Sequence, residues 1–129
     1  MKDEILFLSF SLLLGCQIIP PSDKYRYDKI YIDSIKVSDT IKFNQKFTVE
    51  IYGTYPTPGW ELYKYEIKET ESEIEITPIA RIRKDIIVPQ VLTPFKLQLE
   101  LLNNKEIDSV KIIVVGKTSK IEKTVTVAK

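Results

Sequence analysis

The feature that most constrains the fold is an alternation of apolar and polar residues along much of the chain. Its clearest example is a segment in which every second residue is apolar: Phe95, Leu97, Leu99 and Leu101. Successive side chains of a β-strand point to opposite faces, so this pattern predicts a strand with one buried face. The composition agrees, because the chain has 19 Ile but only 2 Ala, and Ile favours strands whereas Ala is the best helix former. No segment has convincing helical spacing, so we expect an all-β protein.

Similar patterns recur along the chain, separated by turns that contain Pro, Gly or Asn. The apolar sets are Tyr31, Ile35, Val37 and Ile41; Phe47, Val49 and Ile51; Tyr63, Tyr65 and Ile67; Ile74, Ile76, Ala80 and Ile82; 110–115; and 121–127. The apolar side changes between Leu62 and Tyr63, which predicts a β-bulge or a change of sheet. Pro78 interrupts its set, so we expect an edge strand or two short strands there.

About seven strands of this kind fit a single immunoglobulin-like antiparallel β-sandwich. A closed barrel is the alternative. In the sandwich, we expect the strand that begins at Phe95 to face the core beside three residues of a neighbouring strand, namely Val110, Ile112 and Val114.

The N-terminal sequence differs from the rest of the chain. The apolar run from Ile5 to Gly15 has the length of a signal-peptide core and is too short to span a bilayer. It ends in Leu13-Leu14-Gly15-Cys16, which resembles the lipobox of bacterial lipoproteins. The resemblance implies cleavage before Cys16 once its thiol carries diacylglycerol. Residues 1–15 are then a lipoprotein signal peptide, and Cys16 is the lipidated first residue of the mature chain.

One feature departs from the usual signal peptide. Asp3 and Glu4 offset the charge of Lys2, whereas such peptides normally begin with a net positive charge. The alternative is that residues 5–15 form a buried strand or helix and that Cys16 is a small core residue.

The lipobox interpretation also divides the rest of the chain. Residues 16–28 contain Pro20-Pro21 and lack periodicity, so we expect a tether there and a β-sandwich domain over 29–129. Fatty acyl chains such as palmitate on Cys16 would hold the protein on a membrane. The residue after Cys16 is Gln17 and not Asp. By resemblance to the sorting patterns of diderm bacteria, this residue permits transport to the outer membrane. A monoderm cell would keep the protein on its cell membrane.

Charge and composition exclude several classes of function. The chain has 19 basic and 18 acidic side chains, so it lacks the positive charge that nucleic-acid binding requires. It has no His and one Cys, which excludes zinc tetrads and nucleophiles that depend on His. We therefore expect no metal, no cofactor and no catalytic residues.

Two charged clusters are further candidate sites. The acidic cluster is Glu66, Glu69, Glu71, Glu73 and Glu75, and we expect a solvated strand face rather than an opposed catalytic pair. The basic cluster is Lys64, Lys68, Arg81, Arg83 and Lys84, and we expect these side chains to pair with the nearby glutamates rather than to bind an anion.

Aromatic residues around the turn Pro56-Thr57-Pro58-Gly59 are the best candidate for a binding surface, because a rigid aromatic surface binds at low entropic cost. The set is Tyr52, Tyr55, Trp60, Tyr63 and Tyr65, and we expect the surface to comprise Tyr55, Trp60, Tyr63 and Tyr65. The competing expectation is that Trp60 packs in the core.

The same turn supports a second resemblance. The patterns Gly53-x-x-Pro56-x-Pro58-Gly59-Trp60-x-Leu62 and Gln90-Val91-Leu92-x-Pro94-Phe95 resemble a group of small bacterial envelope lipoproteins. That group carries cysteines where this chain has Gly59 and Val88. Their joint absence implies that the two cysteines bond each other, so Gly59 and Val88 should be neighbours.

Together these features predict a non-enzymatic, lipid-anchored protein of the bacterial cell envelope. We expect a binding or accessory module with an envelope protein as its partner. The alternative is an inhibitor or enzyme that uses loops at one end of the sandwich, including the loop from Thr54 to Gly59.

Overall fold

The structure is a computed structural model and describes residues 24–128. The lipobox, Cys16 and Gln17 lie outside the described residues. The described part contains nine strands: β1 (Tyr25–Lys29), β2 (Tyr31–Val37), β3 (Thr40–Lys42), β4 (Lys46–Tyr55), β5 (Glu61–Glu69), β6 (Glu73–Arg83), β7 (Thr93–Leu102), β8 (Ser109–Val115) and β9 (Lys120–Ala128). Over these residues there is no helix of the length and apolarity needed to cross a membrane.

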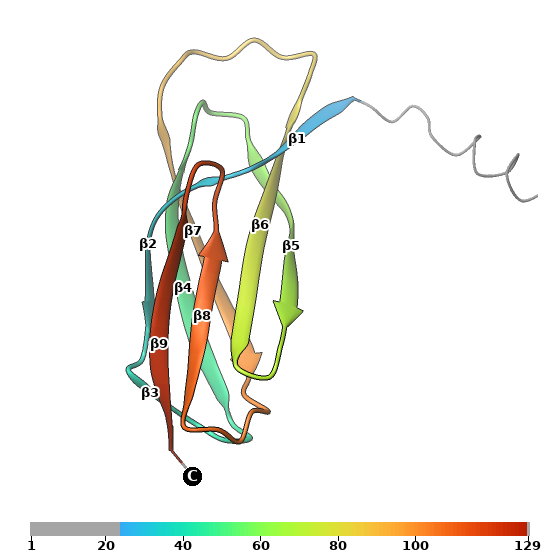
Figure 1. The fold of residues 1–129 in the computed structure, drawn as a ribbon. Helices are drawn as coiled ribbons and strands as arrows, with labels where there is room; N and C mark the ends of the chain where they lie inside the picture. Colours follow the sequence, from blue (N-terminus) through green and yellow to red (C-terminus); the bar gives the residue numbers. More distant parts are fainter. Residues whose placement is uncertain (1–23, 129) are drawn as a thin grey trace, which may run out of the picture.

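The strands form a sandwich of two sheets (Figure 1). The larger sheet has six strands. Five of them follow the order β1-β6-β8-β9-β3, in which β1 and β8 share one edge of β6, and β5 pairs with the opposite edge of β6. The smaller sheet has the order β2-β4-β7. The expectation of an all-β sandwich is confirmed, with nine strands in place of about seven.

Two strand pairs are parallel, which differs from the antiparallel sandwich that we expected. β3 pairs with β9, and β6 pairs with β8, in the parallel direction. The remaining pairs are antiparallel. An alternating sequence tells which face of a strand is buried, but it does not tell the direction of the neighbouring strand.

β6 is a central strand, so the expected edge strand at Pro78 is wrong. One edge of β6 pairs with β5, and the other edge pairs first with β8 over 73–76 and then with β1 over 79–83. Pro78 falls in the gap between those two partners. A residue without an N–H is tolerated there because that edge has no ladder bond to lose.

The core lies between the two sheets. β7 contributes Phe95 and Leu99, which are buried, and Leu97 and Leu101 pack against the same cluster. Val110, Ile112 and Val114 of β8 are fully buried. The expected inward face of β7 is therefore confirmed, although β8 lies in the opposite sheet rather than beside β7.

Two bulges shift the register of edge strands. The bulge in β5 falls between Leu62 and Lys64, as the change of apolar side predicts. A second bulge in β2, between Ile32 and Ser34, places Ile32 in the core. The expectation that Tyr31 and Val37 share one face is therefore wrong. Gly53 lies opposite this bulge, where an added Cβ would overlap the carbonyl oxygen of Tyr31.

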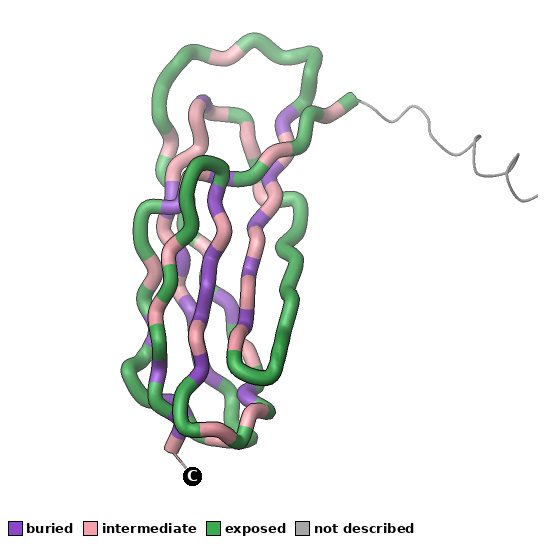
Figure 2. The backbone as a smooth tube through the Cα atoms, in the orientation of Figure 1, coloured by how far each residue is buried: buried purple, intermediate pink, exposed green. Residues whose placement is uncertain are grey.

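The domain begins earlier than the sequence predicts. β1 starts at Tyr25 and pairs with the end of β6, from Tyr25 opposite Arg83 to Lys29 opposite Ile79. Residues 25–28 therefore belong to the sandwich and not to a tether. Figure 2 shows that β5 is exposed along most of its length, in contrast to β8 beside β6.

Candidate binding surface

The aromatic residues around the turn 56–60 do not form one surface. Tyr52 lies on β4 in the smaller sheet, where its hydroxyl donates a 2.6 Å hydrogen bond to Oε1 of Glu50. Tyr65 lies opposite the buried Pro78, on the inner side of β5, and is exposed because the smaller sheet does not cover this edge. Tyr52 and Tyr65 are therefore separated from Tyr63, which faces outward.

Tyr55 and Trp60 pack against the core. The ring of Tyr55 meets that of Phe95 edge to face, with centroids 5.2 Å apart. Burial, together with the charge of Glu61, raises the pKa of Tyr55 above its ordinary value. The indole of Trp60 packs against the core cluster, and the guanidinium of Arg26 lies 5.8 Å from the ring centroid. These two residues support the end of the sandwich rather than an open surface.

The structure instead gathers three tyrosines around Arg81 on the outer face of the larger sheet. We call Tyr25, Tyr27, Tyr63 and Arg81 the tyrosine–arginine platform. The Arg81 guanidinium carbon lies 4.2 Å from the ring centroid of Tyr25 and 5.2 Å from that of Tyr63. The rings of Tyr27 and Tyr63 meet edge to face at 4.9 Å. The tyrosines thus hold the cation through the negative faces of their rings.

Strand register brings these residues together. Tyr27 pairs with Arg81 across β1 and β6, and Glu61 pairs with Arg81 across β5 and β6. Directly opposed residues of antiparallel strands point to the same face. Nε of Arg81 donates a 2.6 Å hydrogen bond to Oε2 of Glu61, which raises the pKa of Arg81 above its ordinary value. Arg81 is therefore charged and fixed in place.

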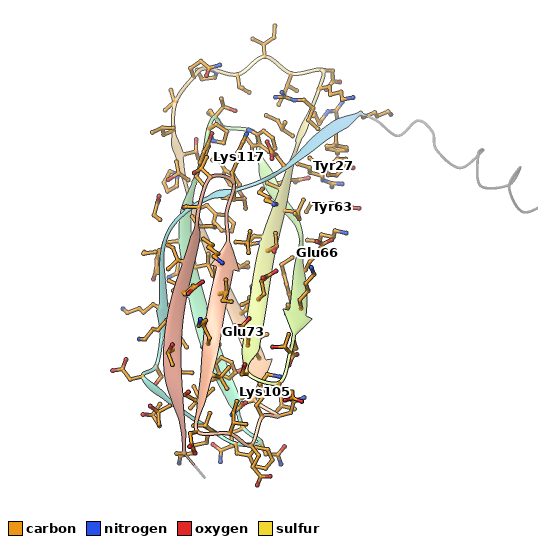
Figure 3. The ribbon with its side chains drawn as sticks, in the orientation of Figure 1. Tyr27, Tyr63, Glu66, Glu73, Lys105 and Lys117 are labelled. Carbon is orange, nitrogen blue, oxygen red and sulfur yellow. The ribbon has the colours of Figure 1, made fainter. Side chains whose placement is uncertain are left out.

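A shallow hollow of about 430 Å³ adjoins the platform and is lined by Tyr27, Tyr63, Lys64, Glu66 and Ile79. Figure 3 places Tyr27 and Tyr63 close together, with Glu66 farther along β5. Tyr27 and Tyr63 are 48% and 45% exposed, so about half of each ring surface is open to a ligand. Nζ of Lys64 and Oε2 of Glu66 form a 3.2 Å ion pair at the rim.

The acidic cluster is dispersed. Glu66, Glu69 and Glu71 are exposed, whereas Glu73 and Glu75 are partly buried on β6. Glu69 forms a 3.1 Å ion pair with Lys105, which belongs to the segment between β7 and β8. Residues 24–128 contain no group of three or more potential ligands for a metal ion.

Three side chains of the basic cluster pair with carboxylates. Two of these carboxylates, those of Glu61 and Asp85, lie outside the acidic cluster. Arg81 pairs with Glu61, and Arg83 makes two hydrogen bonds, of 2.9 and 2.7 Å, to the carboxylate of Asp85. The Arg83 guanidinium lowers the pKa of Asp85 below its usual range. The expected pairing was with glutamates of the acidic cluster on neighbouring strands. Instead, Lys64 pairs with Glu66 of its own strand, Arg81 pairs across strands with Glu61, and Arg83 pairs with Asp85.

The end of the sandwich above the platform consists of the turn 56–60 and the loop 84–92. In the turn, Thr57 is buried and Gly59 has a positive φ of 93°. A Cβ built on Gly59 would lie 3.4 Å from Cγ1 of Val88. The two positions implied by the second resemblance are therefore neighbours. The projecting segment at this end is the loop 84–92, which arches over the turn (Figure 1).

Comparisons with protein-family models, curated proteins and solved structures found no match for this chain. Of the four residues expected to form the binding surface, Tyr63 alone joins the platform. Tyr25 and Tyr27 were missed because they were assigned to the tether. Their spacing of two residues, with Arg26 between them, was the signal that could have indicated a strand.

Proposed function

We propose that this protein is a non-enzymatic, lipid-anchored envelope protein that binds a partner protein through the tyrosine–arginine platform. The observation that carries the proposal is the exposure of two tyrosines beside a fixed guanidinium. Tyr and Arg are the residue types that dominate binding energy in protein interfaces. Because Arg81 is already held by Glu61 and two rings, little conformational entropy remains to be lost on binding.

Lipid anchoring rests on the lipobox and needs its own test. Cys16→Ala should abolish acylation and cleavage, so the membrane fraction should lose the processed form. Mass spectrometry of the N-terminal peptide should find acyl chains on Cys16 in the unaltered protein. An unmodified Cys16 in a protein that still begins at Met1 contradicts the anchoring.

The binding test uses a photo-crosslinking amino acid at position 63 of the full chain, in native envelopes. The matched control places the same amino acid at position 52, which is also a tyrosine on a strand but belongs to the opposite sheet. A protein adduct from position 63 that is absent from position 52 is the expected result. The double variant Tyr27→Ala and Tyr25→Ala should then reduce the yield of that adduct.

The same adduct from both positions, or none from position 63, contradicts the assignment of the platform. Thermal unfolding of each variant checks that the sandwich is intact. The turn from Thr54 to Gly59 is the weaker candidate for an inhibitory or catalytic loop, since Thr57 is buried and Ile86 and Val88 lie against Gly59.

A further inference from the structure

The loop 84–92 exposes four aliphatic side chains at one end of the molecule: Ile86, Ile87, Val91 and Leu92. Ile87 is 99% exposed and Leu92 is 72% exposed. Single exposed apolar residues are normal on a soluble surface, whereas several in one projecting loop indicate contact with an apolar environment. Ile86 also lies against Gly59, whereas the high exposure of Ile87 and Leu92 leaves them little packing on the sandwich.

The position of the loop limits what can cover it. It forms the extreme upper end of the described domain in Figure 1, beyond the turn 56–60 and opposite the C-terminal end. A flat surface that meets this end of the sandwich therefore meets the loop first. The platform lies on the side of the sandwich, on the outer face of β1, β5 and β6, so it stays accessible.

The base of the loop carries an excess of positive charge. The N–H of Lys84 donates a 2.8 Å hydrogen bond to the carbonyl oxygen of Lys24, so Lys24 lies directly beside the loop. Arg83 hydrogen-bonds the carboxylate of Asp85 and Lys24 also lowers its pKa, while Lys84 precedes it in the sequence, so three basic residues accompany one acidic residue at this base. Aliphatic side chains above basic ones suit the boundary between acyl chains and anionic headgroups.

The same hydrogen bond places the start of the described chain at this end of the domain. Cys16 precedes Lys24 by eight residues, and an extended chain of that length reaches at most about 29 Å. Acyl chains on Cys16 would therefore keep the base of the loop within that distance of the bilayer. No other end of the sandwich is so constrained.

We propose that the loop 84–92 inserts Ile87, Leu92 and their aliphatic neighbours into the surface of the membrane that holds the protein. This inference rests on the proposed lipid anchoring. The loop and the acyl chains then make two contacts with one bilayer. These contacts fix the orientation of the sandwich relative to the bilayer and leave the platform accessible on the side of the sandwich. The partner of the loop is lipid, in contrast to the protein partner proposed for the platform.

The test places an environment-sensitive fluorophore on the loop of the full chain. Cys16 is the only cysteine, and acylation blocks its thiol, so Ile87→Cys supplies a single reactive thiol. The purified protein is reconstituted into vesicles of phosphatidylethanolamine and phosphatidylglycerol that contain a nitroxide-labelled lipid quencher. Asn104→Cys is the matched control, because Asn104 is also exposed but lies between β7 and β8 at the opposite end.

A blue shift of the emission and quenching by the nitroxide lipid are expected at position 87 and not at position 104. Equal exposure of both probes to water overturns the proposal, whatever the state of Cys16. A probe at position 87 that is shielded in native membranes but not in pure vesicles also overturns it and identifies a protein as the occupant.

Mass spectrometry of the same sample separates this inference from the anchoring. An acylated Cys16 with a probe in water refutes the loop contact and leaves the anchoring intact. An unmodified Cys16 refutes the anchoring, and the contact is then measured in a Cys16→Ser background, where position 87 or 104 carries the single thiol and a quenched probe at 87 supports the contact. Since Ile87 makes almost no contact with the sandwich, its replacement does not disturb folding.

Discussion

The two ends of the sandwich are closed in opposite ways. At the lower end of Figure 1, the buried Asn103 donates from Nδ2 to the carbonyl oxygen of Lys42 and accepts at Oδ1 from the N–H of Lys105. Its backbone adds a 2.7 Å bond from the N–H of Asn44 and a 3.0 Å bond to the oxygen of Gln45. At the upper end, the loop 84–92 leaves aliphatic side chains in solvent. One end satisfies its polar groups internally, whereas the other leaves Ile87 and Leu92 largely exposed.

The difference indicates which end the fold needs and which end is available for contact. A buried amide that joins three segments stabilises the fold because an unpaired polar group there is costly. Exposed aliphatic groups contribute nothing to the stability of the isolated domain. Substitutions at the lower end should therefore reduce the stability of the protein. Substitutions at the upper end should instead change what the protein contacts. The following predictions test this division, beginning with the core that both ends share.

Leu99→Ala should have the largest effect on stability. Leu99 is 5% exposed, pairs with Val49 of the neighbouring strand β4, and faces the core between the sheets. We expect the free energy of unfolding to fall by about 2 to 5 kcal/mol. Urea denaturation measures the change, and Glu100→Ala, on the outer side of the same strand, is the control. Similar losses for the two variants would mean that β7 presents its faces differently.

Asn103→Ala should cost about 1 to 3 kcal/mol, because the backbone groups that the amide satisfies would be left unpaired. Ile87→Ser at the other end should change stability by less than about 0.5 kcal/mol, since the side chain is fully exposed. Chemical denaturation of both variants, with Asn104→Ala as a neighbour control, compares the two ends directly. If Ile87→Ser were the more destabilising, the division between the ends would be refuted.

A cross-link should tie the upper end to the sandwich. Gly59→Cys with Val88→Cys joins the turn 56–60 to the loop 84–92, and disulfides typically add about 2 to 4 kcal/mol. The positive φ of Gly59 offsets about 1 to 2 kcal/mol of this gain, because a side chain is strained there. This strain is present in both redox states, so the oxidised variant should exceed the reduced variant by the full contribution of the disulfide, about 2 to 4 kcal/mol. Thermal unfolding with and without reductant measures it, and an equal melting temperature in both states would contradict it.

The smallest effect concerns the ion pair that fastens β1 beside the turn 116–119. Nζ of Lys117 donates a 2.6 Å hydrogen bond to Oδ2 of Asp28, and this bond lowers the pKa of Asp28 below its ordinary value of 3.8. The stabilisation is therefore complete above pH 3.8 and disappears as the pH falls through the lowered pKa. Because the pair is partly exposed, we expect about 0.2 to 1 kcal/mol.

Lys117→Met should remove this contribution at neutral pH and reduce the loss of stability below pH 3.8. Denaturation curves at several pH values measure the difference between the variant and the unaltered protein. Parallel pH profiles for the two proteins would show that the pair contributes nothing.

The sequence predicted which face of a strand is buried better than it predicted which strands are neighbours. The alternation along 95–101 located the inward side of β7, and the change at Leu62 located the bulge in β5, because both features are local. The central position of β6 was missed, since Pro78 is compatible with a central strand only where two partners leave a gap. That gap depends on β1 and β8, which are distant in sequence.

The candidate site was predicted less well for the same reason. Tyr63 was chosen because it follows the rigid turn, but its companions Tyr25 and Tyr27 come from a strand that looked like a tether. Arg81 joins them only through the register of β1 with β6 and of β5 with β6. Similarly, 84–92 reads as an ordinary apolar segment, and nothing local to it indicates that the core leaves Ile87 outside.

The pairing of distant strands sets the order in which the chain folds during synthesis. β1 cannot form its ladder until β6 has emerged. β3 needs β9, the last of the described strands, and β8 pairs with β6 on one edge but needs β9 on the other. Such long-range closures are slow, and unpaired strand edges are prone to aggregate before they occur. The nine residues of β9 therefore determine when the larger sheet closes. Without the residues from Lys120 onward, β3 would have no partner in the larger sheet and one edge of β8 would be unpaired.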